Sequence, residues 1–100
     1  MATVALYPHI AKEPGICGGQ ASIDATRVRV MDVVWLHKQG RSPERILEVY
    51  PHLNLGQVHA ALGYYYDHLQ EIEESFREED LSEAAFEARR AELMRRRAAG

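Results

Sequence analysis

The residues of this chain best suited to chemistry are five histidines and a single cysteine, and their spacing fits no catalytic arrangement. A histidine and a cysteine can form a nucleophilic pair, but no third group stands at a spacing that would orient the base. The histidines do not follow metal-ligand spacing either. Gly15, Gly18 and Gly19 are not followed by the Lys and Ser or Thr of a phosphate-binding loop. We therefore expect a protein that is not an enzyme and needs no cofactor or metal.

A block of arginines near the C-terminus is either a solvated helix face or a segment that contacts a partner. Five arginines lie between Arg89 and Arg97, against Glu92 alone. Cations in the last turn of a helix also complement its dipole, which explains the last three arginines better than Arg89 and Arg90. A guanidinium can pair with a carboxylate through two N–H groups. The candidates for contact with a partner here are Phe86, Arg89, Arg90, Leu93 and Met94.

An apolar repeat precedes these arginines, with spacings that alternate between three and four residues. Its members are Leu55, Val58, Leu62, Tyr65, Leu69, Ile72 and Phe76. The repeat predicts one long helix from Asn54 to Glu79, whose second half projects past the rest of the fold among acidic residues. An exposed stripe is unfavourable by roughly 1.5–3 kcal/mol per large side chain. We therefore expect Leu69, Ile72 and Phe76 to contact a second copy or another protein, with Tyr64 and Tyr66 as flanking candidates.

Shorter elements are expected before this helix. Two strands, His9–Glu13 and Ile23–Val30, are separated by a glycine-rich loop. A first helix over Met31–Gln39 ends at Gly40. A second helix starts at Pro43 after the capping Ser42 and ends before Pro51, and the third starts at Asn54 with Gln57 completing the cap. The expected core includes Ile46, Leu47, Val58 and Leu62.

The predicted fold is mainly α with a small N-terminal β-hairpin and a trihelical, helix-turn-helix-like core. Its third helix extends into the long helix, and a further helix starts at Asp80 or Ser82. That last helix either folds back on the long one as a hairpin or stays marginal until a partner binds. The division is residues 1–8 as an extension, 9–66 as the domain and 67–100 as an interaction segment. No apolar run approaches the ~20 residues of a membrane span, and a single cysteine suits the cytoplasm.

Three spaced blocks carry a resemblance to a known family. They are Pro14-Gly15-Ile16-Cys17-Gly18-Gly19, Thr26-Arg27-Val28-Arg29-Val30, and the run from Gly40-Arg41-Ser42-Pro43 through Tyr50-Pro51. Together they resemble the family catalogued as domain of unknown function family 433, small bacterial and archaeal proteins often encoded beside PIN-like nuclease toxins and read as their antitoxins. That family usually has glycine before Thr-Arg, where this chain has Ala25, so either this position does not need a positive φ or the turn is altered.

The resemblance implies an antitoxin that binds a PIN-like nuclease toxin, and we expect a homodimer. A PIN-type site gathers carboxylates around a divalent metal, and an arginine could stand in for the charge of that metal. The rival function is a stand-alone helix-turn-helix transcription regulator. Its candidate DNA contacts are Arg29, Lys38, Arg41, Arg45 and Gln57, whereas Arg27 is expected to be structural and to pair with Asp24. Because the third helix has no Lys or Arg before Arg77, we expect weak DNA binding by a monomer, and operator binding by an oligomer or complex stays open.

Overall fold

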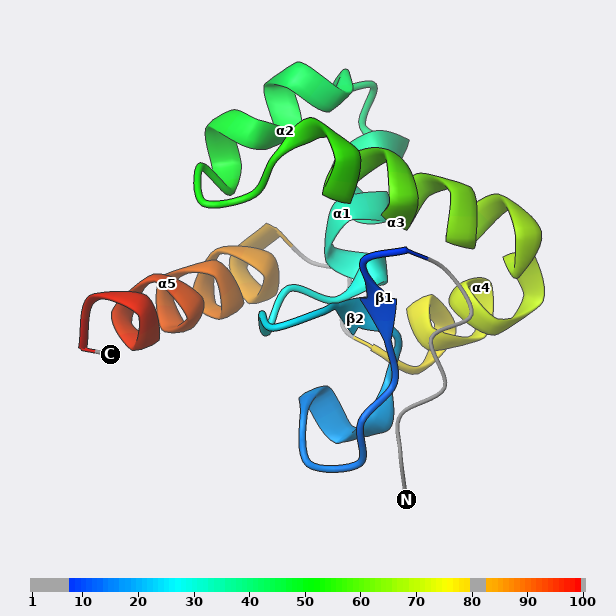
Figure 1. Cartoon of the computed structure of the whole chain (residues 1–100), viewed down its shortest axis with the longest axis horizontal. Helices are drawn as coiled ribbons and strands as arrows, with labels where there is room; N and C mark the ends of the chain where they lie inside the picture. Colours follow the sequence, from blue (N-terminus) through cyan, green and yellow to red (C-terminus); the bar gives the residue numbers. More distant parts are fainter. Residues whose placement is uncertain (1–7, 80–82, 100) are drawn as a thin grey trace.

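The computed structural model describes residues 8–79 and 83–99, and the side chains of residues 8–79 and 84–95. As predicted, the fold is mainly helical with a short antiparallel hairpin near the N-terminus (Figure 1). The elements are β1 (Ile10–Ala11), a 3-10 turn η1 (Cys17–Gly19), β2 (Ser22–Ile23), α1 (Val30–Lys38), α2 (Pro43–Val49), α3 (Leu55–Asp67), α4 (Leu69–Glu78) and α5 (Glu83–Ala99). The expectations for residues 1–7 and for a helix cap at Asp80 or Ser82 lie outside the described residues.

The second strand is much shorter than predicted, because a tight turn replaces most of it. Ile10 pairs with Ile23, and the chain then turns so that the Ile23 N–H donates to the Val28 carbonyl at 2.9 Å. The Thr26 hydroxyl donates to the Ile23 carbonyl at 2.7 Å and closes this turn. Ala25 takes a positive φ of 63°. The turn therefore requires a left-handed backbone conformation at this position. Glycine adopts this conformation without penalty, but here the residue is alanine.

The three predicted helices α1, α2 and α3 pack against one another. The predicted caps are confirmed: the Ser42 hydroxyl accepts from the Arg45 N–H at 3.2 Å, and Asn54 and Gln57 cap α3 reciprocally at 2.8 and 2.9 Å. Gly40 ends α1 with a φ of 87°. Of the predicted core residues, Ile46, Val58 and Leu62 are buried and Leu47 is partly buried against them.

The predicted long helix is broken at His68, which has φ −133° and ψ 46°. The His68 Nδ1 donates to the Tyr64 carbonyl at 3.0 Å, and the two rings stack with centroids 4.1 Å apart. The chain turns there, and α4 packs back against α1. Ile72 and Phe76 are buried in the core, so the prediction that they project from it is wrong. Folding back removes from water an apolar stripe that would otherwise be exposed.

The last helix, α5, packs across α1 rather than forming a hairpin with α4. Figure 1 shows α4 and α5 on opposite sides of α1. Leu93 of α5 belongs to the same core cluster as Ile10, Val58 and Ile72, so one core includes residues from both sides of the predicted boundary at 66 and 67. Within the described ranges, none of the helices combines the length and apolar character needed to cross a membrane.

Candidate functional site

The centre of the candidate site is Asp32, a carboxylate only 3% exposed in the first turn of α1. It accepts the backbone N–H of Arg29 at 2.9 Å and so caps the start of α1. The Arg29 guanidinium donates to the same carboxylate, with Nη2 2.9 Å from Oδ1. An acid at this position is favourable because the helix N-terminus carries partial positive charge. The carboxylate is therefore fixed by α1 itself before any other element contacts it.

Arg29 is a buried structural residue, which corrects its prediction as a DNA contact. Besides Asp32, its guanidinium donates to the Gln20 side-chain oxygen at 3.1 Å and forms an ion pair with Glu79. Burial opposes the charge of Arg29, but the charges and hydrogen bonds of Asp32 and Glu79 outweigh burial and raise its pKa. Contact with a phosphate would require breaking this cluster, and an uncompensated buried charge costs several kcal/mol.

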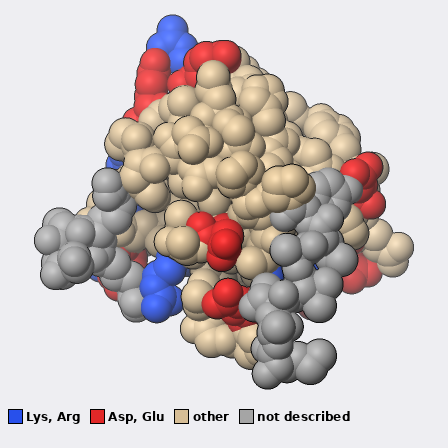
Figure 2. All heavy atoms as spheres, in the orientation of Figure 1, with Lys and Arg blue, Asp and Glu red and all other residues tan. Residues whose placement is uncertain are grey.

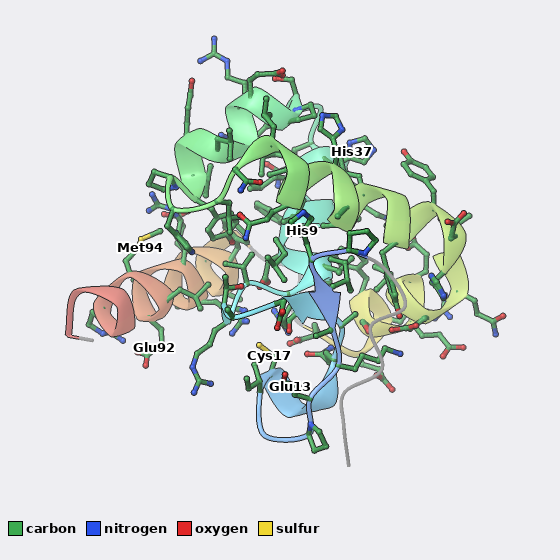
Figure 3. The ribbon with its side chains drawn as sticks, in the orientation of Figure 1. His9, Glu13, Cys17, His37, Glu92 and Met94 are labelled. Atoms are coloured by element: carbon green, nitrogen blue, oxygen red, sulfur yellow. The ribbon has the colours of Figure 1, made fainter. Side chains whose placement is uncertain are left out.

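Arg89 of α5 reaches the same buried carboxylate. Its Nε lies 3.1 Å from each carboxylate oxygen of Asp32. Its Nη2 donates to the backbone carbonyl of Arg27 at 2.9 Å and lies 3.9 Å from the Cys17 sulfur. Figure 3 shows the partly exposed Cys17 on η1, on the side of this turn that faces the rest of the fold. The guanidinium of Arg89 is thus surrounded by acceptors that other parts of the chain hold in place.

Apolar contacts fix α5 on either side of Arg89. One turn earlier, Phe86 stacks on Trp35 with ring centroids 4.0 Å apart and an interplanar angle of 13°. One turn later, Leu93 is buried, and Met94 packs partly buried against the core. Figure 3 shows Met94 and Glu92 on opposite sides of α5. We call Phe86, Arg89 and Leu93 the docking face of α5, and Asp32, Trp35 and the Arg27 carbonyl the docking site.

The predicted partner-contact residues of α5 therefore come together, but on the body of their own chain. Arg90 lies half-buried beside them. Asp32 and Trp35, which form the docking site, were missed by the sequence analysis. One signal was available for Asp32: an acid three residues after Arg29 at a strand-to-helix transition is typical of a capping residue. Leu69 is 46% exposed and lies at the start of α4.

The predicted DNA contacts other than Arg29 are exposed or half-buried, and three of them already contact other groups of the chain. Lys38 Nζ lies 2.7 Å from a Glu73 carboxylate oxygen, and its position over the Phe76 ring adds a cation–π contact. Arg45 pairs with Glu48 on α2 at 3.0 Å. The side chain of Gln57 caps α3. Arg41 is exposed.

Arg27 and Tyr64 also differ from expectation. The Arg27 side chain is exposed, and the structural role falls to its carbonyl, which accepts from Arg89. Tyr64 is buried, with its hydroxyl donating to Glu71 at 2.8 Å, so it is not available as an interface residue. Tyr65 is buried as predicted and Tyr66 is exposed. Among the described residues, no group of three or more His, Cys, Asp or Glu side chains could hold a metal ion.

A comparison with protein families shows which family this chain belongs to. The model of the family described as "Protein of unknown function (DUF433)" matches residues 10–65, which run from β1 through most of α3. The chain belongs to the DUF433 family. The matched region contains Asp32 and Trp35, whereas the docking face of α5 lies beyond it. The DUF433 match thus includes the docking site and excludes the helix that occupies it.

A solved structure supports the same assignment. The crystal structure of a DUF433 member protein from Anabaena variabilis is similar to this chain with a TM-score of 0.63 and 36% sequence identity. The likeness covers 67% of this chain and 66% of that one, so this DUF433 chain spans about two thirds of its relative's length. A search of curated proteins found no match.

Proposed function

We propose that this protein is a non-catalytic antitoxin that binds and neutralises a PIN-like ribonuclease, with α5 as the segment that contacts the nuclease. The observation that carries the proposal is the docking of Arg89 on Asp32. This contact supports the view that Arg89 of α5 is suited to bind a buried carboxylate, with Phe86 and Leu93 as apolar anchors on either side of it. A nuclease site that gathers carboxylates around a metal would offer the same chemistry to the same face.

The way α5 is held suits exchange between two sites. Phe86 and Leu93 anchor it, and a hollow of about 150 Å³ lies beside Phe86, between α1, the end of α4 and α5. An aromatic pair contributes about 0.5–1.5 kcal/mol beyond its buried area, and a hydrogen bond to a charged group about 1.5–3 kcal/mol. A partner can shift α5 only by binding it better than the docking site does. Intramolecular docking would then set a minimum affinity for α5, and a protein that binds α5 more weakly than this would not displace it from the docking site.

The alternative, a stand-alone helix-turn-helix regulator, has less support. The trihelical packing of α1, α2 and α3 agrees with it, as does the capped start of α3. However, Arg29 is buried, and Lys38 and Arg45 are paired with acids. DNA-binding proteins gain most of their affinity from cations on phosphates, so the available charge favours a protein partner.

The proposal is tested by co-expressing the full chain with the product of the neighbouring gene, which the proposal expects to be a PIN-like nuclease. The complex is isolated by affinity purification, and its ribonuclease activity is measured against the free nuclease. We expect the wild-type chain to copurify and inhibit, and Arg89→Glu to lose both properties. Arg95→Glu is the matched control, because Arg95 lies on the same helix, is exposed and pairs only with the local Glu92 among the described residues. Full inhibition by Arg89→Glu would contradict the proposal.

A further inference from the structure

The outward face of α3 is free of formal charge. From Val49 to Tyr66 the chain contains no Asp, Glu, Lys or Arg. Figure 2 shows the resulting uncharged surface in the upper half of the view, over α3 and the loop that precedes it. The exposed positions along this face are Leu55, Gly56, His59 and Tyr66, with Gly63 half-buried among them. Interfaces are depleted of charge at their centres, whereas an ordinary solvent face is not.

Two large apolar side chains mark the ends of this face. Leu55 is 39% exposed and Tyr66 is 56% exposed, and with Leu69 they are the exposed large hydrophobic residues of the described part of the chain. Tyr66 is held in place, because its hydroxyl lies 2.6 Å from His37 Nε2 and the two rings meet edge to face. A tyrosine fixed in advance loses little entropy on binding, which makes it a suitable anchor.

The glycine in the middle of the face has no explanation within the chain. Gly63 lies inside α3, where glycine is about 0.8–1.0 kcal/mol less favourable than alanine. A Cβ atom there would meet nothing within 4 Å. Gly56 is different, since its Cβ would lie 3.3 Å from the capping oxygen of Asn54. A glycine that the fold does not require is understandable if another backbone approaches it closely.

We infer that the α3 face is the contact between two copies of this chain, packed with their α3 helices antiparallel. Leu55 and Tyr66 lie about 16 Å apart along the helix axis, at 1.5 Å per residue. An antiparallel crossing near His59 and Gly63 therefore brings Leu55 of each copy to Tyr66 of the other, as a two-fold interface requires.

Charge argues for a second copy over nucleic acid. Two uncharged faces meet without like-charge repulsion, although each chain has a net charge of −3. The same face offers no cation to a phosphate, and α4, which follows α3, presents Glu71, Glu74 and Glu78. A single 13-residue helix makes a small contact compared with the ~800 Å² per partner of a standard interface. We therefore expect a weak dimer that forms in the micromolar range and dissociates on dilution.

This inference does not rest on the proposed function, because α5 packs on α1 and the turn after β2 rather than on α3. The test is sedimentation equilibrium of the full chain from low micromolar to near-millimolar concentration. We expect the wild type to move from the mass of one chain to that of two. Gly63→Glu should raise the dimer Kd at least about tenfold, because it places two carboxylates about 7.5 Å apart along the helices, one on each side of the two-fold axis. Its folding is checked by thermal denaturation, and a half-buried helical site where an added Cβ meets nothing within 4 Å should tolerate glutamate.

Two further variants separate the α3 face from a general effect of charge. Ala88→Glu adds the same charge at an exposed position of α5 and should leave the dimer unchanged. Tyr66→Ala removes an anchor without adding charge and should also raise the dimer Kd. A chain that stays monomeric at every concentration would overturn the inference, as would a dimer that Gly63→Glu leaves intact. Loss of duplex DNA binding by Gly63→Glu in a monomeric chain would assign the face to nucleic acid instead.

Discussion

Arg89 places its Nε 3.1 Å from each carboxylate oxygen of Asp32, although 57 residues separate the two in sequence. Asp32 is already bonded to Arg29 at the start of α1, so Arg89 is the second guanidinium on one buried carboxylate. The contact joins the C-terminal helix to the DUF433 region. It also shows that α5, which carries the candidate partner-binding residues, binds a docking site on its own chain.

The first prediction concerns the strength of this contact. Arg89→Gln should lower the free energy of unfolding by about 1–3 kcal/mol, because Asp32 then loses one of its two charged partners in a buried setting. Arg95→Gln, on an exposed part of the same helix, should stay within about 0.5 kcal/mol of the wild type. Urea denaturation followed by circular dichroism measures both. Equal effects of the two changes would show that the Arg89 contact contributes nothing specific.

The second prediction compares two apolar residues on α4. Ile72 is 3% exposed and Leu69 is 46% exposed, although they lie three residues apart. Ile72→Ala should cost about 2–5 kcal/mol as a large-to-small change in the core. Leu69→Ala should cost less than about 1 kcal/mol. If chemical denaturation gave similar losses for both, the break at His68 and the return of α4 to the core would be wrong.

The third prediction concerns Ala25, which occupies a left-handed position with φ 63°. For a residue with a Cβ this conformation costs roughly 1–2 kcal/mol, and the greater freedom of glycine in the unfolded chain offsets part of that. Ala25→Gly should therefore stabilise the protein by about 0.5–1 kcal/mol, seen as a higher Tm. Gly40→Ala is the reciprocal control at φ 87° and should destabilise by a similar amount. A lower Tm for Ala25→Gly would refute the strain at this turn.

Much of the fold could be predicted from local signals in the sequence. The end of α1 follows from Gly40, the start of α2 from Ser42-Pro43 and the start of α3 from the Asn54–Gln57 cap, and each of these signals acts within a few residues. Burial of Ile46, Val58 and Leu62 follows from the helical period. These features are decided by neighbours in sequence, so periodicity and capping rules are sufficient for them.

The remaining features depend on contacts between distant residues. The apolar repeat from Leu55 to Phe76 continues unchanged through His68, and neither Pro nor Gly marks the break. What stabilises the break is the burial of Ile72 and Phe76 against other elements, which a heptad pattern does not reveal. Only one half of the candidate site, the residues of α5, was predicted from the sequence. Asp32 and Trp35 were missed, because they lie more than 50 residues before the residues that they contact.

The fourth prediction concerns acid sensitivity at Glu73, on α4. The hydrogen bond from Lys38, together with one from Tyr65, lowers the pKa of Glu73 below its ordinary 4.5. A lowered pKa means that ionised Glu73 stabilises the fold above that ordinary value, and that this stabilisation is lost as the pH falls through the folded-state pKa. Both side chains of the Lys38–Glu73 pair are partly exposed, so the effect should stay below about 1 kcal/mol.

The measurement for Glu73 is the difference in Tm between the wild type and Glu73→Gln at two pH values. The wild type should be the more stable at about pH 7, and the difference should become smaller as the pH falls below 4.5 and Glu73 takes up a proton in the folded chain. A difference that persists or grows on acidification would contradict the assigned direction of the pKa change.

The central claim is that α5 leaves its docking site to bind a nuclease, and one titration tests it most directly. The affinity of the nuclease for the full chain is measured by calorimetry for the wild type, for Trp35→Leu and for Arg89→Gln. Trp35→Leu weakens the docking site while leaving α5 intact, so it should tighten nuclease binding, because less of the protein is held in the docked state. Arg89→Gln removes the proposed contact and should weaken binding about tenfold or more. If Trp35→Leu fails to tighten binding, or if both variants shift the affinity in the same direction, α5 does not exchange between the two sites.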